Sequence, residues 1–186
     1  GDRPVWFKAS IGLAVAFVSA GGRRIELERI PAGVPGRPTL VFLHEGLGSV
    51  AMWRDFPARV AHACGCGAVV YSRFGYGRSA PLEGPRGVRY MHDEALVALP
   101  DVLHAVGVVR PVLVGHSDGG SIALIHAGAG HAVAGLVLLA PHVFVEDVSI
   151  ASIAVAGRAF DRTDLRARLA RYHDDVDSAF RGWNDI

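Results

Sequence analysis

An apolar run leads into a helix-compatible run across Pro111-Val112-Leu113-Val114-Gly115-His116-Ser117-Asp118-Gly119-Gly120-Ser121-Ile122-Ala123-Leu124. A Gly-x-Ser-x-Gly pattern separates the two runs. Glycines suit a sharp strand-to-helix turn, because backbone and side chains approach there too closely for a Cβ. Such a turn raises the Ser117 hydroxyl clear of the sheet, beside the free N–H groups of a helix N-terminus. The pattern therefore predicts a nucleophilic serine, and a tight turn without chemistry is the alternative.

Two other blocks precede this turn. They are Leu43-His44-Glu45-Gly46-Leu47-Gly48-Ser49 and Ser72-Arg73-Phe74-Gly75-Tyr76-Gly77-Arg78-Ser79. With the three blocks in this order, the sequence resembles the α/β-hydrolase family from about Ala16 to the end of the chain. The resemblance implies a parallel sheet with flanking helices and a serine nucleophile at the turn.

Composition narrows the class of protein. The 186 residues suffice for one domain with a sizeable core, and 51% of them are hydrophobic, which excludes disorder and suits a sheet buried on both faces. With 19 basic and 18 acidic residues, the net charge of +1 argues against a nucleic-acid partner. We expect neither nucleic acid nor membrane among the partners.

The cysteines and histidines give no sign of a metal or cofactor. Cys64 and Cys66 lie too close in sequence for an ordinary disulfide and would supply half a metal site at most. No two histidines have the spacing His-x-x-x-His or His-Glu-x-x-His. We expect two semi-buried thiols in a reducing compartment, no metal, no cofactor and a cytoplasmic location.

The N-terminal residues allow a second location. Lys8 is followed by an apolar stretch with small residues, 9–20, which has the outline of a signal peptide but is too short to span a bilayer. An exported protein is therefore the alternative. We expect this region to end instead in a first strand at 14–19, turned by Gly21-Gly22 into a second strand whose residues alternate in polarity.

Strands alternate with helices along the rest of the chain. Expected strands lie at 24–30, 39–43, 68–71, in the run before the serine turn, and at 135–139. Expected helices are one capped by Ser49 and broken or bent near Pro57, one at 90–106 kinked by Pro100, and others at 119–129, 150–160 and 163–180. This order predicts a single α/β domain with an N-terminal extension (1–13), a mostly parallel sheet that ends after its sixth strand (14–147), and cap-like helices (148–186).

The candidate site lies where the parallel strands end. Carboxyl ends of such strands meet at one edge of a sheet, so His44, the loop 75–79, Ser117 and His142 should gather there. As the nucleophile, Ser117 needs a base within hydrogen-bond reach.

The resemblance also implies an oxyanion hole. Its donors would be the backbone N–H groups of Gly46 and Asp118. Glu45 departs from the family pattern, which commonly has glycine at this position. Its carboxylate could hold a water, orient a base or point to solvent, and we expect the last of these.

The base and the acid of a triad are harder to find. The resemblance places both after two further strands that this sequence does not contain, so we expect either a fragment of a longer hydrolase or a naturally shortened one. His142 follows the strand at 135–139 and is the best substitute for the base, with Glu146 or Asp147 to orient it. His116 should point away from Ser117 and play a packing role.

The first functional hypothesis is a serine hydrolase that cleaves a small carboxylic ester through an acyl-enzyme on Ser117. Candidate substrate-binding residues are His44, Glu45, Trp53, Phe74, Tyr76 and Phe144. A C–C hydrolase, a thioesterase or an acyltransferase would carry the same turn, whereas a dehalogenase resembles this fold but has Asp where Ser117 stands. The alternative from another class is an inactive hydrolase fragment that serves as an assembly module.

The apolar strand at 135–139 bears on the partners. At the edge of a sheet it would be an association hazard, because an uncharged edge strand pairs readily with another chain. The cap-like helices could fold over it. We expect instead that a second copy pairs or packs there, giving a homodimer or a higher homo-oligomer whose partner could also supply a histidine near Ser117.

Overall fold

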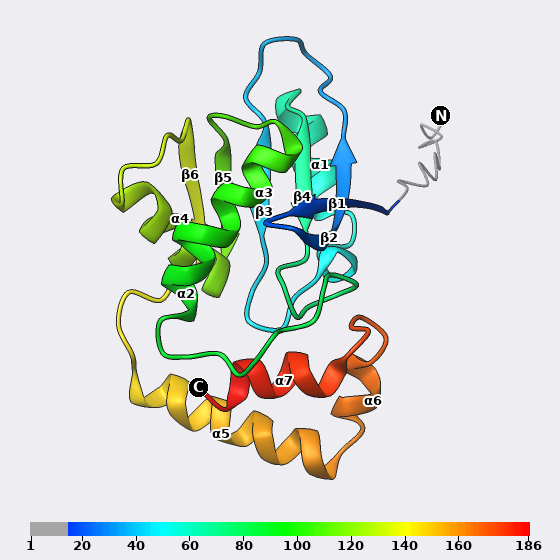
Figure 1. Ribbon diagram of the computed structural model, residues 1–186, viewed down its shortest axis with the longest axis vertical. Coiled ribbons are helices and arrows are strands. Elements are labelled where there is room, and N and C mark those ends of the chain that lie inside the picture. The colour runs from blue at the N-terminus through cyan, green and yellow to red at the C-terminus, as the bar shows by residue number, and fades with distance from the viewer. Residues whose placement is uncertain (1–14) are drawn as a thin grey trace, which may run out of the picture.

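The computed structural model describes residues 15–186, so the predicted extension 1–13 and residue 14 of the first predicted strand lie outside it. Figure 1 shows a sheet with helices on both faces and a group of helices across one end. The strands are β1 (Ala16–Ala20), β2 (Arg23–Ile30), β3 (Leu40–Leu43), β4 (Ala68–Tyr71), β5 (Val112–His116) and β6 (Gly135–Leu139). Their order in the described sheet is β1-β2-β4-β3-β5-β6. The predicted α/β class is confirmed.

The sheet is mixed, and its parallel part carries the candidate site. β1 and β2 pair antiparallel with each other, and β2 pairs antiparallel with β4. β4, β3, β5 and β6 run parallel. The register aligns His116 of β5 with Leu139 of β6, so both chains leave the sheet at the same level. Residues that follow these two strands are therefore close together at the carboxyl edge.

Both faces of the central strands are buried, as their apolar sequences predict. One face carries Val41, Leu43, Val69, Tyr71 and Leu113, and the other carries Leu40, Phe42, Ala68, Val70 and Val114. The first face packs against α3 (Leu99–Val106) and α4 (Asp118–Gly128), and the second against α1 (Phe56–Cys64). The central strands are thereby held rigidly in register.

The helix predicted after Ser49 is broken, as expected, but two residues before Pro57. A 3-10 turn spans Val50–Trp53 and α1 begins at Phe56, with Pro57 in its first turn, where a missing N–H costs nothing. Ser49 stands at the N-cap position of the 3-10 turn, yet its side chain makes no capping hydrogen bond.

The helix predicted at 90–106 is interrupted by a π-helical segment, Glu94–Ala98, between α2 (Tyr90–Asp93) and α3. The N–H of Leu99 bonds to the carbonyl of Glu94, so one extra residue is accommodated just before Pro100. The register of the buried face shifts as a result. Leu96 is exposed, whereas Leu99, Leu103 and Val106 are in the core.

The C-terminal helices differ from the prediction. α5 covers Asp147–Arg162, but the single helix predicted at 163–180 is wrong: α6 (Leu165–Leu169) and α7 (Val176–Asn184) are separate. Asp175 caps α7 by accepting a hydrogen bond from the Ser178 N–H, which explains the interruption. These helices enclose a small core of their own (Phe160, Leu169, Val176 and Phe180) and lie across the carboxyl end of the sheet in Figure 1.

The outer edge of β6 pairs with no strand of the described sheet. Val137 and Leu139 on one face of this strand are 45% and 37% exposed, and the C-terminal helices lie elsewhere.

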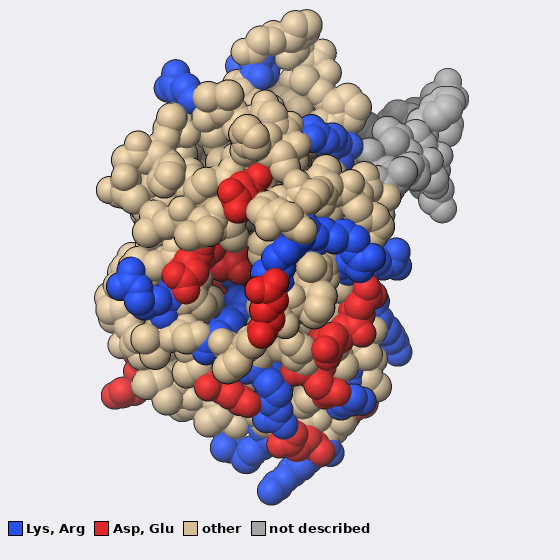
Figure 2. All heavy atoms as spheres, viewed as in Figure 1, with Lys and Arg blue, Asp and Glu red and all other residues tan. Residues whose placement is uncertain are grey.

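No helix within residues 15–186 has both the length and the apolar character needed to span a membrane. Over the face seen in Figure 2, acidic and basic side chains are intermingled.

Candidate active site

Ser117 lies at a sharp turn between β5 and α4. Its backbone has φ 51° and ψ −117°, a conformation that non-glycine residues rarely adopt. The flanking glycines are required by close contacts. A Cβ on Gly119 would lie 2.0 Å from the Leu43 carbonyl oxygen, and one on Gly115 would lie 2.3 Å from the Gly119 carbonyl oxygen. This is the geometry of a nucleophile elbow.

The structure places His142 beside this serine. The Oγ of Ser117 and the Nε2 of His142 are 2.9 Å apart. Ala140, directly after β6, has φ 48°, so the chain turns sharply toward the elbow. The N–H of Ser117 also donates to the carbonyl of Leu139 (2.8 Å), which joins the two strand ends. Both groups of the hydrogen-bonded pair are accessible from solvent.

Ser121 holds the backbone of His142. Its Oγ donates to the His142 carbonyl oxygen (2.7 Å) and accepts from the His142 N–H (2.9 Å). Ser121 lies one turn of α4 beyond Ser117, so one helix holds both members of the pair. The predicted orienting acid is not found: neither Glu146 nor Asp147 forms a hydrogen bond or ion pair with His142 in the described structure.

The two predicted oxyanion donors belong to residues that follow neighbouring parallel strands, β3 and β5, and so lie at the same end of the sheet. Asp118 is the first residue of α4, so its N–H has no acceptor within the helix. Gly46 lies under the indole of Trp183 from α7, and a Cβ there would be 2.1 Å from the indole Nε1. Within the described residues, neither N–H donates a hydrogen bond to a protein group.

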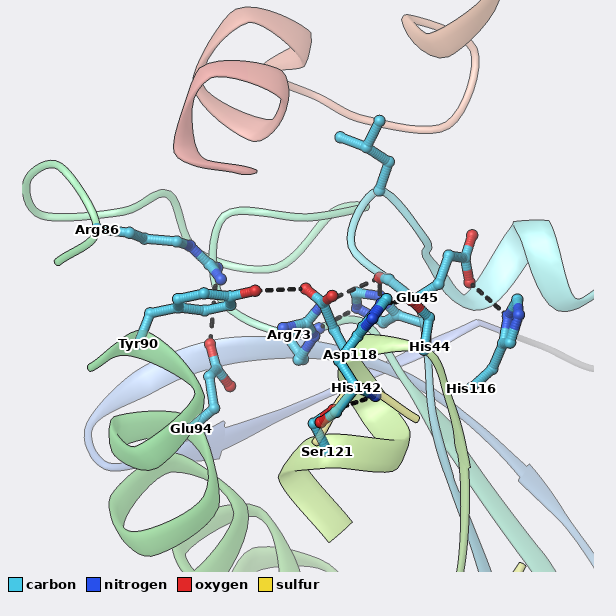
Figure 3. A network of polar contacts seen from close by, with 12 residues as sticks. His44, Glu45, Arg73, Arg86, Tyr90, Glu94, His116, Asp118, Ser121 and His142 are labelled. Atoms are coloured by element: carbon cyan, nitrogen blue, oxygen red, sulfur yellow. Dashed lines mark hydrogen bonds and ion pairs between the residues drawn. The ribbon is translucent and has the colours of Figure 1, made fainter. Parts of the chain in front are cut away.

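A buried polar network lies behind these donors (Figure 3). The Nη2 of Arg73 is 2.9 Å from the carbonyl oxygen of Glu45 and 3.7 Å from Oδ2 of Asp118. The hydroxyl of Tyr90 donates to the same Oδ2 at 2.9 Å. Burial alone would lower the pKa of Arg73, but the anionic groups around it, Glu94 among them, raise it. The guanidinium therefore stays charged although it is fully buried.

A second buried arginine completes the network. Arg86 donates to the carbonyl of Phe74 (2.7 Å) and lies 3.6 Å from the Glu94 carboxylate. Its guanidinium packs over the rings of Tyr76 and Tyr90, at 4.6 and 5.5 Å from their centroids. Burial raises the pKa of Glu94, and the two arginines oppose that rise. Arg86 and Glu94 make no hydrogen bond or ion pair with Glu45 or Asp118, whereas Arg73 contacts both of these residues.

His44 has a structural role in place of the predicted contact with substrate. It is fully buried; its Nδ1–H donates to the Glu45 carbonyl (2.7 Å), and its Nε2 accepts from the Arg73 N–H (3.0 Å). These bonds assign one neutral tautomer. Burial, followed by the charge of Arg73, lowers the pKa of His44 well below its usual value. Tyr76 is buried against the His44 ring and is likewise not placed to touch a substrate.

The remaining predicted binding residues divide between surface and interior. Glu45 turns its carboxylate toward His116, with 3.7 Å between Oε2 and Nδ1, and so does not point only to solvent. Trp53 stacks on Phe56 and contacts the His116 ring edge-on. Phe144 is 68% exposed, two residues after His142, and Phe74 is buried beneath Arg23.

Two residues that sequence reasoning missed attach the C-terminal helices to the site. His173 accepts from the Gly77 N–H at Nδ1 (3.0 Å) and donates from Nε2 to the Leu47 carbonyl (2.9 Å). Burial lowers the pKa of His173. Trp183 covers Gly46, as described above. No local signal in the sequence marks either residue, because their partners are about a hundred or more residues away.

Comparisons with known proteins were made on the sequence and on the fold. A model of the "alpha/beta hydrolase fold" family matches residues 38–181. No curated protein gave a significant match.

Solved structures of similar fold include a carboxylesterase from Nitrososphaera gargenis (18% identity, TM-score 0.66, covering 84% of this chain and 56% of that one). A carboxylesterase from Bacillus subtilis has 23% identity and a TM-score of 0.61, with 78% and 50% covered. Epoxide hydrolase A from Mycobacterium thermoresistibile has 23% identity and a TM-score of 0.55, with 78% and 45% covered. The chain thus spans about half the length of these proteins, and at these identities the likeness shows the fold. Because the family model matches most of this chain, the chain belongs to the α/β-hydrolase fold family.

Proposed function

We propose that the protein is a serine hydrolase that cleaves a small carboxylic ester through an acyl-enzyme on Ser117, with His142 as the general base. The observation that carries this proposal is the 2.9 Å approach of His142 Nε2 to Ser117 Oγ at a strained elbow. A serine hydroxyl becomes a useful nucleophile when a base lies within hydrogen-bond reach. Membership of the family and the carboxylesterases of similar fold support hydrolysis in general.

The reaction follows from the positions of these groups. Ser117 Oγ attacks the ester carbonyl carbon while its proton passes to His142 Nε2. The resulting oxyanion accepts hydrogen bonds from the N–H groups of Gly46 and Asp118. The intermediate collapses, and the alcohol leaves with the proton from His142. A water molecule then gives a proton to His142 and attacks the acyl carbon, which releases the acid and restores the Ser117 hydroxyl.

The nucleophile itself favours acyl substrates. Attack of a serine on an ester or thioester carbonyl gives an acyl-enzyme that water hydrolyses. Attack on an epoxide or a haloalkane would leave an ether on Ser117, which water does not cleave under the same conditions. The likeness to an epoxide hydrolase therefore does not extend to its named substrate. Thioester cleavage, C–C bond cleavage and acyl transfer share the acyl-enzyme step and are the alternatives within this mechanism.

A second candidate is a folded module with an idle serine. It is favoured by the lack of an acid beside His142 in the described structure. In a serine protease, loss of the orienting aspartate lowers kcat by about 10⁴-fold. We therefore expect a slow esterase. A module without any activity would be the extreme result of the same missing acid.

Hydrolysis of p-nitrophenyl acetate by the wild type and by Ser117→Ala tests the proposal. We expect the substitution to lower kcat by at least about 1,000-fold, because the covalent route is removed. Ser152→Ala is the matched control, since Ser152 is exposed on α5 and bonds only to the Val148 carbonyl. Activity that survives in Ser117→Ala would contradict the proposal. Absence of turnover in the wild type would favour the idle module.

We also propose that a second copy of the chain covers the open edge of β6. The strand carries no charged residue, and the exposed Val137 and Leu139 lie on it. An unpaired strand of this kind stabilises association by offering backbone donors and acceptors together with apolar surface.

A further inference from the structure

We infer that Arg73 is a positioning residue for the oxyanion hole: its buried guanidinium holds the Glu45–Gly46 peptide and the Asp118 segment in place together. The inference rests on the proposed function and adds to it a residue that touches no substrate. The two backbone N–H groups proposed as donors, of Gly46 and Asp118, belong to segments about 70 residues apart in sequence. A single side chain joins the two segments from behind (Figure 3).

The Glu45 carbonyl shows how the first donor is aimed. Its oxygen accepts hydrogen bonds from Arg73 Nη2 (2.9 Å), His44 Nδ1 (2.7 Å) and the Gly48 N–H (3.1 Å). In a trans peptide, the C=O and the N–H of the next residue point in opposite directions. Three donors on the Glu45 oxygen therefore turn the Gly46 N–H away from the buried network. Hydrogen bonds to a carbonyl also polarise its peptide and strengthen the N–H as a donor.

The second donor is held through a side chain. Oδ2 of Asp118 lies 3.7 Å from Arg73 Nη2 and accepts the Tyr90 hydroxyl at 2.9 Å. The carboxylate is almost completely buried, so it has no freedom to turn toward solvent. Because Asp118 is the first residue of α4, fixing its side chain also fixes the direction of its free N–H.

Arginine suits this position better than lysine. A planar guanidinium holds its Nη2, the atom that contacts both Glu45 and Asp118, in a fixed position on the group, whereas an ammonium is a compact point charge on a flexible stem. The backbone N–H of Arg73 is itself bound by His44 Nε2 at 3.0 Å, so the residue is held at both ends. Lysine at this position would keep a positive charge near Asp118 while losing the geometry at the Glu45 carbonyl.

The chain offers a matched control in Arg86. Its side chain is also buried, and it belongs to the same network. It donates to the carbonyl of Phe74 and pairs with Glu94, but it makes no hydrogen bond or ion pair with Glu45 or Asp118. A general loss of packing or charge in this network should therefore affect both arginine variants, while a loss of oxyanion geometry should affect one.

The experiment compares Arg73→Lys with Arg86→Lys. The measurements are kcat and KM for p-nitrophenyl acetate and the inhibition constant of an alkyl boronic acid, whose tetrahedral adduct with Ser117 places an oxygen in the oxyanion hole. We expect Arg73→Lys to lower kcat and to weaken the boronic acid in parallel, each by about 10- to 100-fold, as for a misplaced catalytic group. KM should change little. Arg86→Lys should lower the melting temperature yet keep kcat and boronic acid affinity near the wild-type values.

A milder variant keeps the test decisive if Arg73→Lys does not fold. Tyr90→Phe removes only the hydroxyl that bonds Asp118, at a partly exposed position. We expect it to lower kcat and boronic acid affinity by a few-fold with KM unchanged. The inference is overturned if Arg73→Lys folds and matches Arg86→Lys in both measurements, or if Arg73→Lys does not fold and Tyr90→Phe matches Arg86→Lys in both. Labelling of wild-type Ser117 by a fluorophosphonate separates this outcome from a failure of the proposed function, which would abolish the labelling.

Discussion

The two halves of the candidate site are held very differently. The nucleophile half consists of Ser117, Gly46 and Asp118, and its segments are bound by two buried side chains, Arg73 and His44, and by the half-buried Tyr90. The base half is His142 on an exposed segment after β6, where Ser121 supplies the two hydrogen bonds that fix its backbone. For the proposed mechanism, the comparison teaches that stabilisation of the oxyanion would be preorganised, whereas proton transfer would depend on one lightly supported imidazole.

Of the substitutions in the base half, His142→Ala should have the largest effect on kcat. Loss of the general base should lower kcat by about 100- to 10,000-fold, while boronic acid binding should fall much less, because the nucleophile half is intact. Added imidazole should restore part of the activity, since the position is open to solvent. His92→Ala on the exposed face of α2 is the control. Unchanged kcat in His142→Ala would show that another group is the base.

Ser121→Ala should have a smaller effect through the same imidazole. It removes both hydrogen bonds to the His142 backbone, and we expect kcat to fall by about tenfold with KM unchanged, as for a slightly misplaced group. The decisive measurement is a double-mutant cycle with His142→Ala. If Ser121 acts by positioning His142, the second substitution costs nothing further in kcat. Additive losses would instead indicate a separate structural role.

The supports of the nucleophile half predict a dependence of stability on pH. Burial lowers the pKa of His44 and His173 in the folded protein, whereas histidine in an unfolded chain titrates near pH 6.5. Between the folded and unfolded pKa values, the unfolded chain binds more protons, so the free energy of unfolding should fall as the pH drops below about 6.5. Urea unfolding at several pH values checks this.

His173→Gln sharpens the pH experiment. It removes one of the three histidines in the described structure whose pKa is lowered by burial (His44, His126 and His173) and should make the fall in stability shallower, whereas His92→Gln should leave the slope of the wild type unchanged. Because burial raises the pKa of Glu94 and so opposes this trend, the decisive quantity is the difference between the two proteins: a slope in His173→Gln equal to that of the wild type would contradict the assignment of a neutral, buried His173.

The smallest effect on activity is expected at the edge of the sheet. Val137→Lys places a charge on the exposed face of β6 and should shift the protein from dimer to monomer, as read by light scattering. The kcat of each active site should stay the same, because Ser117 and His142 come from one chain. Val109→Lys, on the exposed loop that precedes β5 and outside the β6 strand, is the control. A wild type that is monomeric at micromolar concentration would contradict the proposed association.

Much of the fold follows from local patterns. The strands β4 and β6 have the predicted bounds, because each is a short apolar run: β4 lies between Gly67 and Ser72, and β6 begins at Gly135 and ends two residues before Pro141. The π-helical segment before Pro100 and the break between α6 and α7 were not predicted. Both depend on which backbone groups find a partner, such as the Asp175 cap, and periodicity does not report this.

The candidate site was predictable where it depends on consecutive residues or on the parallel arrangement of the strands. The Ser117 turn is written in consecutive residues, and the proximity of His142 follows from the rule that parallel strands end at one edge. The contacts of Arg73 with Glu45 and of His173 with Leu47 join residues 28 and 126 positions apart. Nothing local distinguishes these side chains from ordinary surface residues, so their burial and partners emerge only from the folded chain.

Reaction with a fluorophosphonate, read by intact mass and peptide mapping, tests the pairing of Ser117 with His142 most directly. We expect one phosphonyl group on Ser117 of the wild type, none on Ser117→Ala, and much slower labelling of His142→Ala. A wild type that takes up no label, a label on another residue, or a rate unchanged by His142→Ala would contradict the account.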